Sequence, residues 1–496
     1  MAVPVRPPAL PILPAPLHAV GRPGAPMPLG AGTRVVAVGE AEAVGAIAAA
    51  QLSVLLDREV PVAHDDGRPG AIVLRLLSGG AGASSPGAYR IQVDSVRALV
   101  TAVDLDGLRH GAVTLRQLLV PTTDGGRGLR PAFVVDAPRF TWRGLHLDVA
   151  RSFFPVETVE KVVDVAAALK LNVLHLHLSD DQGWRLELPS RPLLTQISGR
   201  TAVDGGQAGF YTAADYARIQ VHAGSRGITV IPEIDMPGHV NAAQHAYGEL
   251  NPGGEPVPAY TGTEVGFSRL HPDLPATLPF IRDVVTEVAA MTRGPFLHIG
   301  GDEALAMQRP EYSRMIATIA EQVRVAGKTL VGWQEITQTP LAPSTVVQFW
   351  DPRADTSDLV DAAWQGARVV LSPAQHVYLD MKYDADTPIG SDWVGTTELR
   401  DAYEWEPMES VLGLLPGSIA GVEAAVWTEY VHDEQELFTL LLPRLAAVAE
   451  VAWSVPPRRS WPDFAVRVAR YAPTWDAAGL PWYRSPQVAW ETGAGR

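Results

Sequence analysis

The residues with the clearest chemical potential form a short run, residues 298–305, in which two glycines precede two adjacent carboxylates. Residues 296–299, apolar except for His298, are predicted to form a short buried strand, and the glycines let the backbone turn sharply where it ends. Asp302 and Glu303 would then lie side by side at the strand end. Adjacent carboxylates repel each other, which raises the pKa of one and lets it act as a general acid. Such a pair is also common in the first turn of a helix, but the strand and glycines before it favour catalysis.

Polar or aromatic side chains follow most of the other strands predicted in this part of the chain. They are Asp148, Arg151, Asp180, Asp181, Asp235, His239, Trp333, Trp350, Trp427 and Glu429. Indole rings stack on the C–H faces of sugars, while carboxylates and guanidinium groups bind hydroxyls. The combination therefore favours a neutral, polyhydroxylated substrate.

The elements that would position these groups alternate between strand and helix from residue 140 onward. The predicted strands are residues 144–149, 172–178, 229–233, 296–299, 329–333, 345–350, 368–371 and 419–426. The predicted helices between and after them are residues 156–169, 212–226, 276–291, 311–326, 355–365 and 433–453. Eight strands with interleaved helices predict an α/β fold, a (β/α)8 TIM barrel, whose active site lies where the C-terminal strand ends meet. We expect a Pro-rich arm at 1–30, a small α+β domain at 31–135, and the barrel with a C-terminal extension at 136–496.

Composition narrows the classes of partner and chemistry. The 496 residues carry a net charge of −15 without a long basic cluster, which argues against nucleic acid and anionic membranes as partners. The absence of cysteine excludes disulfides, thiolate catalysis and cysteine-ligated zinc. No convincing signal peptide or membrane span is predicted, and both a secreted and a cytoplasmic location stay open. Oligomeric state is not predicted.

Several motifs in order along residues 135–455 together resemble glycoside hydrolase family 20, the β-N-acetylhexosaminidases. They are residues 147–155 (LDVARSFFP), 176–185 (LHLSDDQGWR), 232–239 (PEIDMPGH), 260–267 (YTGTEVGF), 298–305 (HIGGDEAL) and 426–429 (VWTE). Residues 31–135 resemble the small α+β domain that precedes the barrel in that family. The resemblance implies exo-acting, retaining hydrolysis of N-acetylhexosamine-terminated oligosaccharides, such as chitooligosaccharides, without a metal or other cofactor.

The resemblance also implies roles for individual residues. Glu303 would be the general acid, Asp302 would polarise the substrate's 2-acetamido nitrogen, and Tyr378 would hydrogen-bond the acetamido oxygen. That oxygen would itself attack the anomeric carbon, as in other substrate-assisted glycosidases. Three tryptophans would enclose the acetamido group and the sugar ring (Trp333, Trp350, Trp427), and three charged residues would bind ring hydroxyls (Arg151, Asp380, Glu429). Trp393 would stack on the next sugar. Four further residues would form the supporting polar network (Asp180, Asp235, His239, His298).

Two other functions fit parts of the sequence. His175 and His177 alternate on one predicted strand, as zinc ligands do in metal-dependent amidohydrolases, but tryptophan stands at later strand ends where more histidine ligands would be needed. A non-catalytic glycan-binding protein on the same barrel would keep the tryptophans and lose the acid, whereas Glu303 is present. The sequence leaves open whether N-acetylglucosamine or N-acetylgalactosamine is preferred.

Overall fold

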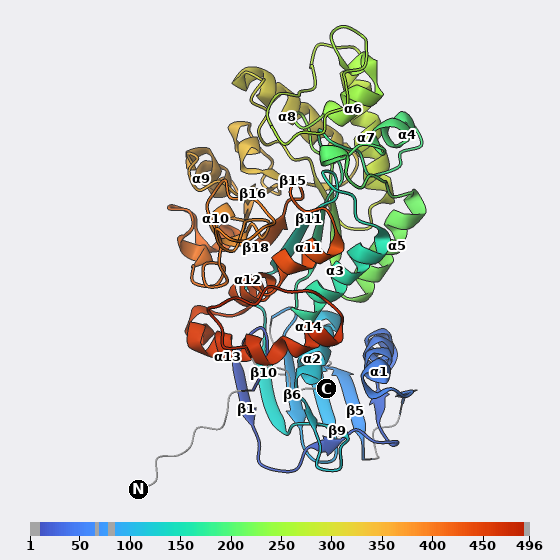
Figure 1. Cartoon of the computed structure of the whole chain (residues 1–496), viewed down its shortest axis with the longest axis vertical. Coiled ribbons are helices and arrows are strands. Elements are labelled where there is room, and N and C mark those ends of the chain that lie inside the picture. The colour runs from blue at the N-terminus through green and yellow to red at the C-terminus, as the bar shows by residue number, and fades with distance from the viewer. Residues whose placement is uncertain (1–9, 65–68, 78–84, 491–496) are drawn as a thin grey trace.

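The chain forms a mixed β-sheet unit and a closed barrel, as the computed structural model describes them for residues 10–64, 69–77 and 85–490 (Figure 1). The sheet has seven strands in the order β1-β10-β6-β7-β5-β3-β4. Its strands are β1 (His18–Gly21), β3 (Arg34–Val36), β4 (Val62–Ala63), β5 (Ala71–Leu76), β6 (Tyr89–Val93), β7 (Ala98–Ala102) and β10 (Ala132–Asp136). Helices α1 (Glu42–Leu56) and α2 (Leu105–Gln117) pack on it, which gives the α+β character that the sequence predicts.

The edge strand β1 comes from the predicted Pro-rich arm. It pairs antiparallel with β10, with His18 opposite Val135. Leu10 and Ile12, just before it, are buried in the core of the same sheet unit. The described part of residues 1–30 is therefore integral to this unit and differs from the separate arm expected, because its apolar residues find a partner strand more than 100 residues away.

Eight parallel strands close into the predicted (β/α)8 barrel. They are β11 (Trp142–Asp148), β12 (Val173–His177), β13 (Thr229–Glu233), β14 (Phe296–His298), β15 (Thr329–Trp333), β16 (Val346–Phe349), β17 (Arg368–Leu371) and β18 (Ile419–Val426), with β18 paired to β11. An apolar cluster with one residue from every strand, among them Trp142, Phe296 and Val370, fills part of the interior. The barrel is therefore a packed core with its site at one mouth.

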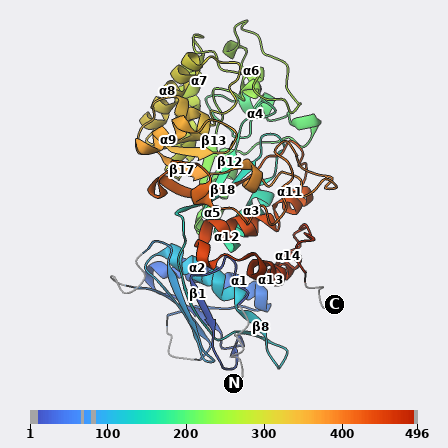
Figure 2. The same ribbon diagram turned by 90° about the vertical axis from the view of Figure 1, so that its left-hand side faces the viewer.

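Helices surround the barrel on the outside (Figure 2). They include α3 (Val156–Ala168), α5 (Ala213–Ser225), α7 (Thr277–Met291), α8 (Arg309–Val325) and α9 (Ser357–Trp364), close to the predicted ranges. The single helix predicted over residues 433–453 is instead two, α11 (Glu434–Leu441) and α12 (Arg444–Trp453). Pro443 separates them because proline lacks the N–H that would continue the helix.

The two units join through α12 and the helices that follow it, α13 (Trp461–Tyr471) and α14 (Pro473–Ala477). Trp453, the last residue of α12, is buried in the core of the sheet unit and donates its indole N–H to Asp136, 3.1 Å away. Lys170, which follows α3, pairs with the same carboxylate at 3.2 Å. Aromatic packing and a buried ion pair therefore connect the sheet to the barrel.

Within the described residues, one helical segment, Gly39–Leu56, is long and apolar enough to cross a membrane by length and composition alone. It contains α1, whose residues Val44, Ala48 and Leu52 are buried in the core of the sheet unit. A helix that packs on a sheet has the same composition, so the segment is explained by its place in the fold.

Candidate active site

The predicted mouth of the barrel holds a cavity of about 360 Å³. Its walls come from the ends of the barrel strands and the loops that follow them. Lining residues include Arg151, Asp302, Glu303, Trp333, Trp350, Arg353, Tyr378, Asp380, Trp393, Trp427, Glu429 and Tyr430. Four predicted residues, Asp180, Asp235, His239 and His298, are buried behind this wall and do not line the cavity. The fold therefore places the predicted site residues in two layers, one that lines the cavity and one that is buried behind it.

The acid pair lies on a turn that only glycine can form. Gly300 and Gly301 have φ angles of 67° and 95°, and a Cβ on Gly300 would stand 1.8 Å from Asp235 Oδ1. Asp235 accepts the Gly301 N–H at 3.1 Å, and His298 Nδ1 accepts the Gly300 N–H at 3.0 Å. The two buried residues thus fix the turn that presents Asp302 and Glu303.

The two carboxyl groups of the pair have different surroundings. Asp302 is buried, and burial, together with the charges of Glu233 and Glu303, raises its pKa to about 6 against the lowering effect of His239. Glu303 is more exposed and faces the cavity, with a left-handed backbone at φ 44°. Such a backbone is uncommon outside glycine and is typical of functional sites, where the surrounding structure holds it in place.

A series of buried, charged side chains contacts Glu303. His239 Nε2 lies 3.5 Å from Glu303 Oε2 and 3.7 Å from Asp302 Oδ2, while its Nδ1 lies 3.1 Å from Asp180 Oδ1. Burial would lower the pKa of His239, but the charges of Asp180 and Asp235 outweigh it and hold that pKa well above its usual range. An imidazolium is therefore held between Asp180 and the acid pair.

Arg151 contacts several carboxylates in the cavity wall. Its guanidinium lies 2.9 Å from Asp180, 3.5 Å from Asp148 and 3.7 Å from Glu429, and it sits 5.0 Å from the ring centroid of Trp427. Asp380 accepts the Trp427 backbone N–H at 3.2 Å. Burial and the neighbouring Glu429 raise the pKa of Asp380 to about 8. This wall thus offers charged and neutral hydrogen-bonding groups suited to sugar hydroxyls.

The aromatic residues form the rest of the wall. Trp333 is almost fully buried and lies 5.7 Å from Trp427 between ring centroids, whereas Trp350 is near-parallel to Tyr378 at 6.5 Å. Trp393 is 42% exposed at the rim and meets Trp350 edge-on at 6.0 Å. The rings therefore form a box that is closed at its buried end by Trp333 and open at the rim beside Trp393.

Sequence reasoning missed the polar layer beneath this box. Glu233 Oε1 accepts the indole N–H of Trp333 at 2.8 Å, and its Oε2 lies 2.6 Å from His177 Nδ1 and 3.0 Å from His175 Nε2. Glu423 binds the other nitrogen of His175 at 2.8 Å. Histidines at alternate positions of one strand were the available signal, but their carboxylate partners on β13 and β18 become visible only in the closed barrel.

These histidines do not form an open metal site. His175, Glu233 and His298 offer ligand atoms within 4.8 Å of one another. However, Glu233 lies 2.6 Å from His177 and 3.0 Å from His175, which are hydrogen-bonding distances, whereas two atoms that each lie about 2.0–2.1 Å from a tetrahedral zinc are held about 3.3 Å apart. The pKa of His175 is raised to about 9 because the charges of Glu233 and Glu423 outweigh burial. His177 is held as an imidazolium in the same way, whereas burial lowers the pKa of His298.

A half-buried carboxyl, that of Glu335, contacts one of the tryptophans of the box. Glu335 follows β15 and accepts the indole N–H of Trp350 at 3.1 and 3.2 Å with its two oxygens. Burial and the charge of Asp302 raise its pKa to about 8. No sequence pattern indicates this contact, since Glu335 belongs to a short helical turn of a kind that is usually on the surface.

The comparisons with known proteins agree with this geometry. The family model "Glycosyl hydrolase family 20, catalytic domain" matches residues 140–456, and "Glycosyl hydrolase family 20, domain 2" matches residues 9–137. A beta-N-acetylhexosaminidase of Cellulomonas fimi is 52% identical over 97% of this chain and 98% of its own length. A beta-hexosaminidase of Vibrio furnissii is 35% identical over 73% of this chain and 64% of its own.

Solved structures are similarly close. The GH20 beta-N-acetylhexosaminidase of Streptomyces coelicolor is 40% identical, with a TM-score of 0.92 over 98% of this chain and 99% of its own. A mutant Streptomyces plicatus beta-hexosaminidase in complex with its product GlcNAc is also 40% identical, with a TM-score of 0.91 over the same shares of the two chains. With both family models matched along nearly all of its length, this chain belongs to glycosyl hydrolase family 20.

Proposed function

We propose that this protein is an exo-acting β-N-acetylhexosaminidase that releases terminal N-acetylglucosamine or N-acetylgalactosamine from the non-reducing ends of oligosaccharides. The observation that carries the proposal is the juxtaposition of the Asp302–Glu303 pair with a closed tryptophan box at the barrel mouth. The chain is similar over nearly its full length to a beta-N-acetylhexosaminidase, and a structural neighbour holds GlcNAc as product.

Glu303 acts as the general acid that protonates the glycosidic oxygen. It faces the cavity, and the imidazolium of His239 behind it orients its carboxyl group. General acid help of this kind contributes about 10²–10⁴-fold to the rate. After the leaving group departs, the same carboxylate takes a proton from water, so one residue serves both half-reactions.

The substrate's acetamido oxygen attacks the anomeric carbon in the first half-reaction. Asp302, as a carboxylate, accepts the acetamido N–H and stabilises the positive charge that develops on the cyclised intermediate. Tyr378 donates its hydroxyl to the acetamido oxygen, and burial raises the pKa of that phenol well above its ordinary value, which keeps it protonated. Trp333, Trp350 and Trp427 confine the acetamido group close to the reacting carbon.

The closed cavity accounts for exo action. Arg151, Asp380 and Glu429 line the same cavity as the acid pair and hold ring hydroxyls, so the cavity of about 360 Å³ takes one sugar. Trp393 at the rim stacks on the sugar that leaves. A chain passing through the site would meet the hydroxyl-binding wall, which restricts cleavage to terminal residues.

The test is hydrolysis of an aryl N-acetyl-β-glucosaminide beside the matched aryl β-glucoside, with the first-formed anomer followed by NMR. We expect a β product from the acetamido substrate and extremely slow turnover of the 2-hydroxyl glucoside. A thiazoline mimic of the cyclised intermediate should inhibit strongly. A covalent glycosyl adduct on an enzyme carboxylate would contradict the mechanism. Loss of activity with EDTA and its recovery with zinc would support an amidohydrolase instead.

A further inference from the structure

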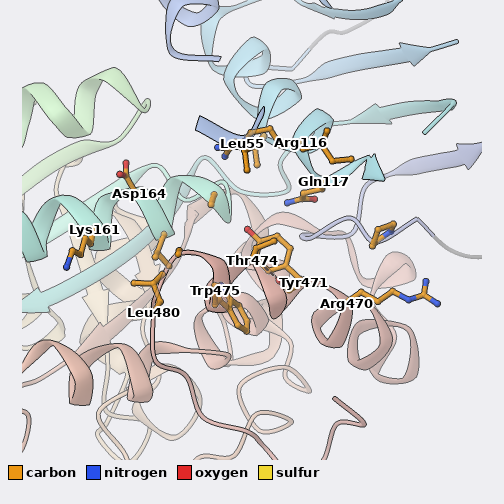
Figure 3. Close-up of a pocket in the computed structure, with 16 residues that line it drawn as sticks. Leu55, Arg116, Gln117, Lys161, Asp164, Arg470, Tyr471, Thr474, Trp475 and Leu480 are labelled. Carbon is orange, nitrogen blue, oxygen red and sulfur yellow. Dashed lines mark hydrogen bonds between the residues drawn. The ribbon is translucent and has the colours of Figure 1, made fainter. Parts of the chain in front are cut away.

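A second cavity, of about 470 Å³, lies away from the active site where the sheet unit meets the barrel (Figure 3). It is larger than the active-site cavity and plays no part in the proposed reaction. Its walls come from α2, α3, α13 and α14, elements distant in the sequence. Figure 3 shows Tyr471 and Trp475 at its centre, with Arg116 on one side and Asp164 on another.

This cavity continues into a neighbouring one of about 360 Å³ between α1, α2 and α3. The two share Leu55, Val113, Arg116, Asp164 and Ala168 in their walls. They are therefore two limbs of one groove, which we call the junction groove, and Arg116 lies where the limbs meet. Both limbs are lined mainly by aliphatic and aromatic side chains.

The guanidinium of Arg116 makes no hydrogen bond or ion pair with any residue that the structure describes, whereas its polar neighbours in the groove have such partners. Lys161 pairs with Glu434 at 2.6 Å, and Asp164 is held by Arg226 at 2.6 Å and by a histidine at 3.1 Å. Burial lowers the pKa of Arg116, and the nearby charge of Asp164 offsets this only in part. A partly desolvated guanidinium without a hydrogen-bonded counter-ion is unfavourable, and an anion bound directly to it would relieve that cost.

The groove also defines the kind of anion. A guanidinium binds a carboxylate through two parallel hydrogen bonds, and the apolar walls formed by Leu55, Val113 and Tyr471 favour an apolar body attached to it. Asp164 on the same wall repels a second negative charge, which disfavours phosphate dianions. We propose that the junction groove binds an organic monoanion, a carboxylate carried on an aliphatic or aromatic frame, with its carboxylate on Arg116.

The direct test is calorimetric titration of the full chain with octanoate, with the active site saturated by N-acetylglucosamine. We expect one site in the wild-type protein. Arg116→Gln should weaken it on the order of 10- to 100-fold, since a charge-assisted hydrogen-bonded pair is lost. Arg90→Gln, on the exposed side of β6, is the matched control and should leave octanoate affinity unchanged.

A second variant and two further probes keep the test decisive. Val113→Trp should fill the shared part of the groove and abolish binding, while hydrolysis of an aryl N-acetylglucosaminide stays unchanged, so the groove is tested independently of the proposed reaction. Acetate should bind far more weakly than octanoate. The inference would be overturned if wild-type protein and Arg116→Gln bound octanoate equally well, or if millimolar octanoate did not bind at all. Acetate or glucuronate binding as tightly as octanoate would also overturn it.

Discussion

Glu303 has a left-handed backbone and contacts His239 at the barrel mouth. Its expected role therefore depends both on having a carboxyl group and on where the backbone and His239 hold that group. Glu303→Gln keeps the shape and removes the proton. We expect hydrolysis of substrates with poor leaving groups to fall ~10²–10⁴-fold, while aryl substrates with acidic phenols lose less in the first step. Steady-state kcat/KM across a series of phenols measures this. Glu321→Gln, on the exposed face of α8, is the control, and equal mild losses for all substrates would assign the acid elsewhere.

Asp302 sets the expected pH dependence. Its pKa is raised to about 6, so it becomes protonated as the pH falls through that value and loses the charge that stabilises the developing cation. We therefore expect kcat/KM, which reports the free enzyme, to fall on the acidic side with a midpoint near pH 6. Asp302→Asn should lower the rate and remove this limb. An unchanged acidic limb in the variant would show that another group controls it.

Glu233 does not line the active-site cavity, yet it contacts both Trp333 and His177. His177 in turn binds Asp180 at 2.7 Å. We expect Glu233→Gln to lower kcat/KM about 10- to 100-fold through misplacement of the box and the acid. Glu423→Gln is the matched control, since Glu423 binds His175 but neither Trp333 nor His177. Both changes should destabilise the fold, and similar activity losses per folded molecule would contradict a positioning role for Glu233.

At the scale of elements, the strand–glycine–acid turn after β14 is the feature that gives the site its geometry. Gly300 and Gly205 have nearly equal positive φ angles, 67° and 69°, but a Cβ on Gly205 meets nothing within 4 Å. Alanine at either position should cost about 1–2 kcal/mol from the backbone alone. Gly300→Ala should in addition displace Asp235 and abolish activity. Urea unfolding and kcat measure the two effects, and an active Gly300→Ala would show that the turn can adapt.

Local pattern predicted most elements because helix and strand periodicities persist along the sequence. The barrel strands appear within a few residues of their predicted ranges, and so do α3, α5 and α8. The exceptions have local or long-range causes. Pro443 divides the predicted helix over 433–453, and β1 gains its strand conformation from pairing with β10, which no local pattern reveals.

At the scale of the whole molecule, the sheet unit and the barrel are connected by a buried charged pair. Asp136 binds Lys170 at 3.2 Å and Tyr89 at 2.6 Å, and all three are buried. Asp136→Asn should lower the free energy of unfolding by about 3–5 kcal/mol, because Lys170 is left buried without a counter-charge. Asp273→Asn removes an exposed pair with Arg314 and should cost at most about 1 kcal/mol. Comparable losses in urea unfolding would contradict this account of the junction.

The sequence by itself determined the barrel, the acid pair and the aromatic set, because strand periodicity, a Gly-Gly turn and residues at strand ends are local features. Tertiary structure decided which of these residues line the cavity and which, such as Asp180 and His239, act from behind it. It alone revealed Glu233, whose partners on other strands meet it only when the barrel closes. The junction groove likewise exists only because α2, α3 and α14, far apart in sequence, pack together and enclose space around Arg116.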